Sequence, residues 1–490
     1  MIAEQLRAAI LQAAISGKLT EQRPDDGTAA DLHRQIAEEE VYLTKAGRLK
    51  KHKPLPPIVE DERPFDIPKT WRWVHFGTVA EFNPKVVARE DTLVSFLPMA
   101  CIEDGYSGVI APESRTWGDV RTNYSRFANG DVIIAKITPC FQNRKSAVVH
   151  ALENGIGAGT TELHVIRPLN GLSRRFVFWL VKSSYLIDSL VPLMTGTAGQ
   201  KRVPLTALKN LPFPLPPLAE QERIVAKLDK LMPLIDQLAE LEREREDLDR
   251  AFFTALEAAI LQAATEGKLT RQRPEDGNAA DLLSRIAEEK TTLVKAGKLK
   301  KPKPLPPVTE DEQPFEIPDN WAWTRLGEVG NWRSGATPNR SDTRYFGGAT
   351  PWVKSGEVEQ DWITETDEYL TVEALAEYSL PLIPPDSVLV AMYGANAGEV
   401  GLLGVEAVTN QAVVAGTLYV DMSSRYVRRY VQSSRRRLES LTSGAAQPNL
   451  SGIKVKNSPL PLPPLAEQVR IAAKLDAVLP LVRELQEASA

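Results

Sequence analysis

Hydrophobic residues recur with helical spacing along one long stretch in the middle of the chain, residues 214–267. Successive members of the series lie three or four residues apart, which places them on one face of an α-helix. At about 1.5 Å per residue, such a helix would be roughly 75 Å long. Its apolar face is too long for one globular domain to cover, so we expect a partner helix. The series consists of Ile224, Leu228, Leu231, Ile235 and Leu238, then Leu248, Phe252, Leu256, Ala259 and Ala263.

The partner is predicted to come from the same chain, because parts of this stretch are repeated elsewhere. Residues 8–77 and 258–327 are identical at 46 of 70 positions at a constant offset of 250. Residues 210–238 and 457–485 are identical at 19 of 29 positions at an offset of 247. Two copies, and no longer array, indicate a pseudo-two-fold frame and not a solenoid.

The two ends of the chain supply the second copy of the helix. Residues 461–490 repeat the beginning of the central stretch and residues 1–20 repeat its end, with Leu6 and Ala9 at the places of Leu256 and Ala259. We therefore predict that the two terminal segments lie end to end, antiparallel to the central helix, with Leu6 and Ala9 on the buried face.

Each copy continues into an arm, residues 21–65 and 268–315. Gly17 and Gly267 are typical of the residue that follows a helix. Thr28 and Asn278, each with an aspartate three residues later, predict the start of a short helix. A basic, proline-rich connector follows at 45–57 and 295–307 and is expected to be extended.

Two variable domains are predicted at 66–213 and 316–460. In both, short β-branched runs alternate with helical patterns, which indicates mixed α/β structure. Their sequences do not obviously resemble each other. The predicted fold class is α/β (α+β): two mixed α/β domains joined and spaced by long antiparallel coiled-coil helices, with pseudo-two-fold symmetry.

Composition narrows the class of protein. The net charge is −5, so any positive surface for nucleic acid must be local. Two cysteines make no disulfide framework, and no apolar run approaches the roughly 20 residues of a membrane span. The first residues lack the layout of a signal peptide. We expect a cytoplasmic protein with no membrane partner.

Motifs for catalysis are missing from the sequence. It contains no phosphate loop, no dinucleotide fingerprint after a strand and no Asn-Pro-Pro-aromatic methyltransferase motif. Five scattered histidines and two cysteines have no metal-ligand spacing. We predict a chain without catalytic residues, metal or cofactor of its own.

The ordered motifs resemble the specificity (S) subunits of type I restriction–modification systems, over nearly the whole chain. The frame contributes PLPPLAEQ at 214–221 and 461–468, GKLT at 17–20 and 267–270, and W-x-W at 71–73 and 321–323. QPNLS at 447–451 and GQKRVPL at 199–205 precede the two PLPP motifs. The second variable domain resembles a common target-recognition type, with SGATPNRSDTRYFGGATPWVKSGE, MYGANAGEVG and TNQAV. The first resembles another type, with FLPMACIEDG, DVIIAKITPCFQNRKSAVV and GTTELHVIRP.

The resemblance implies two target-recognition domains that each bind half of a split site on double-stranded DNA. The paired helices would act as a ruler and as the docking surface for two methyltransferase (M) subunits. Restriction/translocase (R) subunits would join the complex, whose task is adenine methylation, DNA cleavage and phage defence. S-adenosylmethionine, ATP and Mg would belong to the partner subunits. The arm segment often follows the second helix in this family, so this chain resembles a circularly permuted member.

In the first variable domain, the resemblance directs attention to polar and basic residues in two loops, because DNA reading needs groups for base edges and cations for phosphates. The domain has 17 Lys and Arg against 12 Asp and Glu. The candidates are Lys136, Thr138, Gln142, Asn143, Arg144 and Lys145, with Gln200, Lys201 and Arg202. The alternative is that these residues form ordinary solvated loops.

The second variable domain is acidic, with 13 Lys and Arg against 17 Asp and Glu, so binding would depend on a basic subset. We expect Trp352 and Tyr345 in the core, and the run from Arg435 to Arg437 on a solvated or partner-facing surface. The candidate cations are Arg333, Arg340, Arg344 and Lys354; the candidate polar readers are Tyr393, Asn396, Asn410, Gln411 and Asn449.

The acidic balance leaves one alternative function open. The chain could be a coiled-coil adaptor whose two end domains bind proteins and not DNA. Sequence-specific retention on DNA in the presence of a methyltransferase partner separates the two hypotheses.

Overall fold

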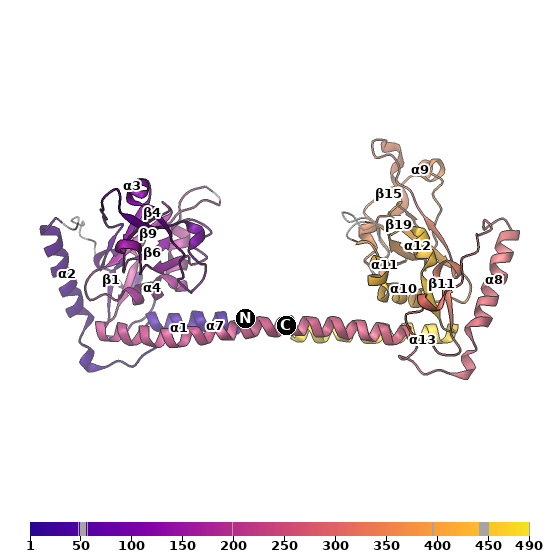
Figure 1. Cartoon of the computed structure of the whole chain (residues 1–490), viewed down its shortest axis with the longest axis horizontal. Helices are drawn as coiled ribbons and strands as arrows, with labels where there is room; N and C mark the ends of the chain where they lie inside the picture. Colours follow the sequence, from indigo (N-terminus) through magenta and orange to yellow (C-terminus); the bar gives the residue numbers. More distant parts are fainter. Residues whose placement is uncertain are drawn as a thin grey trace. The chain divides into compact units, whose positions relative to one another are not determined.

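A computed structural model describes residues 1–47, 49, 55, 57–197, 199–393, 396–440 and 450–489 (Figure 1). The chain divides into two compact units, Met1–Arg245 and Glu246–Ala490. The boundary lies within the central helix α7, Leu218–Thr265, which has 48 residues. Each unit therefore contains one half of α7, one terminal helix, one arm and one variable domain.

In the first unit, helix α1 (Ile2–Ile15) packs antiparallel to the first half of α7. The backbone N–H of Ile2 donates to the Glu242 carboxylate at 2.8 Å. Beyond the other end of α1, Lys227 Nζ donates to the carbonyl of Leu19 at 2.8 Å. Between these contacts, the buried Arg7 pairs with Asp236.

In the second unit, helix α13 (Leu465–Ser489) accompanies the second half of α7. Arg483 Nε donates to Glu257 at 3.4 Å, and Arg470 Nη1 donates to Asp276 at 2.8 Å. Arg223 makes the equivalent contact with Asp26 in the first unit, at 2.6 Å. These guanidinium groups hold the pKa of Asp26 and of Asp276 below the usual aspartate value. That the two terminal helices meet end to end stays a prediction.

The apolar face of the frame differs from the predicted one in part. Ile224, Leu228 and Ile235 are buried as expected, but Leu248 and Phe252 are 70% and 59% exposed. The buried residues there are Phe253 and Ala264, and α1 likewise buries Ala3, Leu11 and Ala14 while Leu6 and Ala9 are exposed. The helices carry apolar residues on two adjacent faces. The first half of the predicted series lies on the buried face, whereas Leu248 and Phe252 of the second half lie on the exposed one.

The arms form as the sequence predicts. Gly17 and Gly267 follow the helices at φ of +70° and +71°, and a Cβ on either would lie about 2.5 Å from a proline ring, Pro68 or Pro318. Helices α2 (Ala29–Lys45) and α8 (Ala279–Lys295) begin with Thr28 and Asn278, which accept from the backbone N–H three residues later. Part of the connector at 45–57 lies outside the described residues.

A buried glutamate in each unit joins three segments that are distant in the sequence. Glu220 accepts from Trp71 Nε1 at 2.7 Å and from Thr20 at 3.2 Å. Gln22 Nε2 donates to the same carboxylate at 2.5 Å. Burial raises the pKa of Glu220, and these donors oppose the rise. The start of α7, the end of the α1 segment and the W-x-W strand therefore share one carboxylate.

The second unit repeats this arrangement with Glu467. Its carboxylate accepts from Trp321 Nε1 at 2.9 Å, from Thr270 at 2.9 Å and from Gln272 at 2.7 Å. The pattern PLPPLAEQ–GKLT–W-x-W is therefore the sequence signature of one hydrogen-bonded junction.

The first variable domain contains two four-stranded sheets. One has the order β2 (Ala80–Phe82), β9 (Leu163–Pro168), β6 (Val132–Ala135), β7 (Ser146–Val148), with antiparallel neighbours. The other has the order β4 (Glu113–Thr116), β3 (Leu93–Leu97), β8 (Ile156–Gly159), β5 (Ser125–Ala128), and its β3–β8 pair is parallel. Helices α3 (Trp117–Val120), α4 (Arg174–Lys182), α5 (Ser184–Leu190) and α6 (Leu205–Asn210) complete the domain.

The second variable domain shares most of this topology, with one strand more in its larger sheet and one fewer in its smaller sheet, although the two sequences do not obviously resemble each other. Its larger sheet has the order β12 (Gly330–Ser334), β19 (Val413–Leu418), β16 (Val388–Ala391), β17 (Val400–Leu403), β14 (Trp362–Ile363). The smaller has the order β15 (Tyr369–Leu370), β13 (Phe346–Val353), β18 (Val408–Thr409), and its β13–β18 pair is parallel. Helices α9 (Val372–Glu377), α10 (Ser424–Ser433), α11 (Arg435–Ser440) and α12 (Gly452–Asn457) follow the pattern of the first domain.

Each variable domain is connected to its frame helix through a two-stranded sheet, and the two sheets are equivalent. Strand β1 (Arg72–His75) pairs antiparallel with β10 (Pro212–Leu215), and β11 (Ala322–Arg325) pairs in the same way with β20 (Pro459–Leu462). The entry and the exit of each domain therefore meet at the start of a frame helix.

No single helix among the described residues is long and apolar enough to span a membrane. One bent pair, Arg174–Lys182 with Ser184–Leu193, passes a test of length and composition. Most of its residues up to Leu190 are buried in the first variable domain.

The junction at Glu220 generates a stability prediction. Glu220→Ala should lower the free energy of local opening of residues 16–28 by about 1–3 kcal/mol, because three donors lose a buried acceptor. These residues should therefore exchange faster. Hydrogen exchange followed by mass spectrometry measures this opening, and residues 266–278 of the other unit are an internal reference. Glu222→Ala, at an exposed position of the same helix, is the matched control. Unchanged exchange at 16–28 would contradict the role of the junction.

Candidate nucleic-acid interface

Two loops predicted from the sequence meet in the first variable domain. The segment after β6 contains Lys136 and Thr138, and the loop before α6 contains Lys201 and Arg202. The N–H of Thr138 donates to the carbonyl of Lys201 at 2.9 Å, and the N–H of Lys201 donates to Thr138 Oγ1 at 3.1 Å. The N–H of Val203 donates to the carbonyl of Lys136 at 2.8 Å. Lys201 and Gln200 are exposed beside this junction.

A third segment, the turn from β8 to β9, joins these two loops. The N–H of Lys136 donates to the carbonyl of Glu162 at 2.9 Å. Arg202 donates to the Glu162 carboxylate from Nε at 2.9 Å and from Nη2 at 2.8 Å, and these bonds lower the pKa of Glu162. Thr160 and Thr161 lie in the same turn and were not among the sequence candidates.

A pocket of about 330 Å³ opens at the end of these segments. Lys136 and Arg126 are its cations, and Asn83, Asn123 and Thr161 contribute amides and a hydroxyl. Cations and neutral hydrogen-bonding groups together suit the phosphates and base edges of a nucleic acid. Only Lys136 in this set was predicted from the sequence, since the others lie on three separate segments.

The loop after Thr138 divides the remaining candidates. Gln142 and Asn143 are exposed. Arg144, at φ +59°, turns inward: Nε donates to the carbonyl of Lys182 at 3.0 Å and Nη2 to Ser184 Oγ at 3.3 Å. Lys145 Nζ donates to the carbonyls of Ile102 at 2.6 Å and Met99 at 3.3 Å. We therefore assign Arg144 and Lys145 to holding the loop, in place of the base contacts predicted for them.

Buried cations surround this loop. Lys182 is fully buried, and burial together with the neighbouring Arg144 lowers its pKa to about 7. Its Nζ donates to the carbonyls of Gly105 at 2.6 Å and Arg144 at 2.7 Å. The Tyr106 ring lies between Arg144 and Arg7 of α1, whose guanidinium carbons are 5.1 Å and 4.6 Å from its centroid. The loop is thereby packed against the frame helix of its own unit.

The same three segments meet in the second variable domain. The N–H of Met392, after β16, donates to the carbonyl of Ala412 at 2.7 Å, in the turn from β18 to β19. The N–H of Leu450, before α12, donates to the carbonyl of Met392 at 2.8 Å. These bonds correspond to those of Lys136 with Glu162 and Val203. Asn449 precedes Leu450 but lies outside the described residues.

The polar candidates of this domain cluster at that junction. Asn396 Nδ2 donates to the carbonyl of Ser355 at 3.4 Å, and the N–H of Asn410 donates to the carbonyl of Val353 at 3.0 Å. Gln411 is exposed and accepts from Thr337 Oγ1. Tyr393, 38% exposed, lies on the same segment as Met392. Thr337 and Ser355 were not predicted from the sequence.

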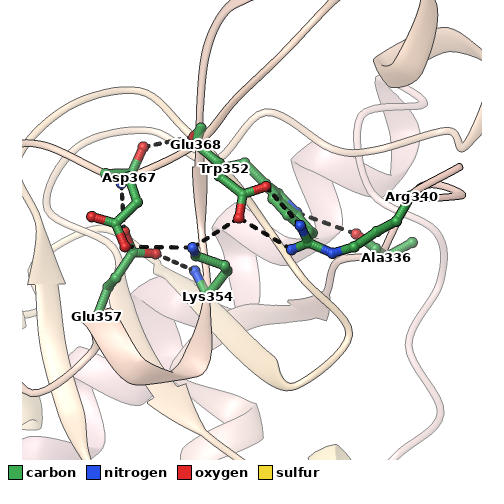
Figure 2. Close-up of polar contacts among 8 residues, drawn as sticks. Ala336, Arg340, Trp352, Lys354, Glu357, Asp367 and Glu368 are labelled. Carbon is green, nitrogen blue, oxygen red and sulfur yellow. Dashed lines mark hydrogen bonds and ion pairs between the residues drawn. The ribbon is translucent and has the colours of Figure 1, made fainter. Parts of the chain in front are cut away.

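Three of the four predicted cations in the second domain are already paired. Arg340 Nη1 and Nη2 donate to Glu368 at 3.1 Å and 3.2 Å, and Lys354 Nζ donates to the same carboxylate at 3.0 Å (Figure 2). These two cations lower the pKa of Glu368. Arg344 pairs with Asp342 at 2.7 Å.

The exposed Arg333 on β12 has no carboxylate partner among the described residues. Asp367 Oδ2 lies 3.5 Å from Lys354 Nζ and provides the second carboxylate for the pair Arg340 and Lys354. The acidic neighbours thus offset the charge of the other three predicted cations. Arg333 is the one candidate cation of this domain whose charge no described carboxylate offsets.

The two aromatic residues expected in the core are there, since Trp352 and Tyr345 are 1% and 4% exposed. The arginine run was expected on a solvated or partner-facing surface; its two described side chains, Arg435 and Arg437, are half-buried, and that expectation stays a prediction. Arg435 pairs with Glu399, and Arg437 Nη2 donates to the carbonyl of Glu312 at 2.8 Å. These contacts join α11 to the variable domain through Glu399 and to the arm through Glu312.

Among the described residues, no group of three or more His, Cys, Asp or Glu is arranged to hold a metal ion. The groups that converge in both domains are amides, hydroxyls, a phenol and a few cations. Such groups bind a polar surface.

Comparison with known proteins assigns the family. The family model "Type I restriction modification DNA specificity domain" matches residues 68–246 and 318–488. The chain is 36% identical to the type I restriction enzyme EcoAI specificity subunit of Escherichia coli, over 99% of this chain and 90% of that protein. It is 35% identical to the EcoEI specificity subunit of the same species, over 96% and 88%. The crystal structure of an HsdS subunit from Thermoanaerobacter tengcongensis has a similar fold, with a TM-score of 0.55 at 22% identity, covering 88% of this chain and 94% of that one. The chain therefore belongs to the family of type I restriction–modification specificity subunits.

Proposed function

We propose that this chain selects the DNA sequence on which a type I restriction–modification complex acts, with each variable domain binding one half of a two-part site. One observation carries the proposal: both domains bring the same three segments together, and their exposed residues differ. A common backbone with different side chains is what two readers of different half-sites need.

The exposed groups suit base edges in the major groove. Gln411 in the second domain, and Gln142 and Asn143 in the first, have exposed side-chain amides that can pair with adenine. Lys136 and Lys201 add cations for phosphates or guanine. Because side chains in the two domains differ at matched positions, each domain would prefer its own bases.

Two methyltransferase subunits would dock on the frame. The exposed apolar face supports this proposal, because it recurs in both units: Leu234 corresponds to Leu481, and Ile2 corresponds to Phe252. All four side chains are exposed. An apolar position that is repeated and uncovered in both units suits two copies of one partner.

The remaining chemistry would belong to the partners. Adenine methylation with S-adenosylmethionine would be carried out by the methyltransferase subunits, and ATP- and Mg-dependent translocation and cleavage by restriction subunits. The chain itself would be non-catalytic and would work in the cytoplasm. The alternative of an adaptor whose end domains bind only proteins is not favoured, because the relatives are specificity subunits.

Exchange of one variable domain tests the half-site assignment. Replacing residues 66–213 with the corresponding domain of another specificity subunit should change one half of the methylated sequence and leave the other half unchanged. Mapping of methylated adenines in cells that carry the complete system measures both halves together. A change in both halves at once would contradict independent reading.

A single side chain tests the second domain. Gln411→Ala should weaken binding by about 1–3 kcal/mol if its amide makes a bidentate base contact. The loss should vanish on DNA whose second half-site is scrambled, as measured by competition binding. Glu406→Ala is the matched control, because Glu406 is exposed before β18 whereas Gln411 follows that strand. Equal losses on both DNAs would exclude base reading by Gln411.

Stoichiometry tests the docking faces. Native mass spectrometry of the co-expressed subunits should find two methyltransferase copies on the wild-type chain. Leu234→Glu or Leu481→Glu should each leave one copy, and the double variant none, because a carboxylate in an apolar contact loses its hydration. Leu234→Met, which keeps the position apolar, should retain two. One copy on the wild-type chain at saturation would contradict the proposal.

A further inference from the structure

The second unit contains a pocket of about 660 Å³ between its connector and its variable domain. On one side the pocket is lined by connector residues Leu299, Lys300, Pro302, Lys303 and Leu305. Strand β12 and helix α12 line the other, with Arg333 and Lys456. The connector was predicted from its composition to be only an extended spacer, so its place in a pocket wall gives it a second role.

The pocket has a concentrated positive charge. Its four cations are Lys300, Lys303, Arg333 and Lys456, and none of them has a carboxylate partner in the part of the chain that the structure describes. The acid in the lining, Glu328, is neutralised by Lys290. Lys300, Lys303 and Arg333 are exposed and Lys456 is half-buried, so a large anionic partner can reach all four.

The pocket adjoins the segments assigned to base reading. Ser334 lines it at the end of β12, and a Cβ on the next residue, Gly335, would lie 1.6 Å from the carbonyl oxygen of Thr409. Helix α12, which contributes Lys456, begins directly after the segment in which Leu450 binds Met392. An anion in the pocket would therefore lie beside the candidate base-reading loops of the same domain.

We propose that this pocket binds backbone phosphates of the DNA whose bases the second variable domain reads, which rests on the proposed function. The domain itself has a negative balance, and the pairs of Arg340, Lys354 and Arg344 cancel its own cations. The connector supplies two lysines from outside the domain. The DNA-binding body of this unit is thus the variable domain together with its arm.

The first unit differs at the matched positions. Asn83 stands where the second unit has Arg333, and its Oδ1 accepts from the N–H of Val165 at 3.0 Å. Lys209 stands where the second unit has Lys456, and its Nζ lies 5.6 Å from the centroid of the Phe82 ring. The first variable domain has a positive balance of its own and depends less on borrowed cations.

Salt dependence of DNA binding tests the assignment, because each phosphate contact contributes about 0.9 to the slope of log K against log salt. Lys300→Gln with Lys303→Gln should lower the magnitude of this slope by about 0.9 per lysine that contacts a phosphate. Adding Lys456→Gln should lower it further. The preference for the specific sequence over a scrambled one should not change, since phosphates carry no sequence information.

The control is Lys298→Gln with Lys301→Gln, which removes two exposed connector lysines that do not line the pocket. The experiment uses the full chain with its methyltransferase partner at one saturating concentration. The proposal is overturned if the slope does not change, or if the control lowers it equally. Binding of inorganic phosphate that the Lys300/Lys303 variant abolishes, with an unchanged DNA slope, would also overturn it in favour of a small anion.

Different results would contradict the proposed function and the phosphate assignment of the pocket. A wild-type complex that prefers no DNA sequence defeats the proposed function itself. A complex that keeps its preference while its salt slope is insensitive to the pocket lysines defeats only the phosphate assignment.

Discussion

A buried carboxylate is the interaction on which each unit depends. Glu220 and Glu467 begin the frame helices, and each accepts from the indole of the W-x-W strand and from the Thr and Gln that follow the neighbouring helix. One side chain thereby fixes a frame helix, an arm and the entry to a variable domain. A buried carboxylate without donors lowers the stability of the fold. A change of the glutamate or of one of its donors therefore requires changes in the other two segments. This explains why the same short motifs recur in both copies while the domains between them diverge.

The divergence of the variable domains kept the core of their topology. The order of the first four strands in the larger sheet, the parallel pair between β3 and β8 or β13 and β18, and the backbone bonds that join the three loop segments are shared. Backbone hydrogen bonds and the alternation of buried positions maintain such a scaffold with many different side chains. The exposed loop residues are free to differ because no core contact constrains them. A fixed scaffold with variable loops suits a pair of readers for unrelated half-sites.

The two variable domains differ in whether their candidate cations are paired with carboxylates. In the first, Lys136 and Lys201 at the loops have no carboxylate partner among the described residues, whereas the predicted cations of the second are largely held by its own carboxylates. Net charge along a sequence did not reveal this, since it counts charges without their partners. In the part of the second unit that the structure describes, the pocket cations without a carboxylate partner lie at the border with the arm, so the connector completes the surface.

The sequence by itself determined the duplication, the two long helices in part and the arm caps, because these depend on local spacing and on repeated motifs. That the two candidate loops of the first domain meet was decided by tertiary structure. Tertiary structure decided which face of the helices is buried, since apolar residues occupy two faces and packing selected the one with Ala3, Ala14 and Ala264. It also decided that Arg144 and Lys145 turn inward and that Arg340 and Lys354 share Glu368. The direction of a long side chain depends on the carbonyl and carboxylate oxygens that folding brings near it, and those oxygens belong to segments far away in the sequence.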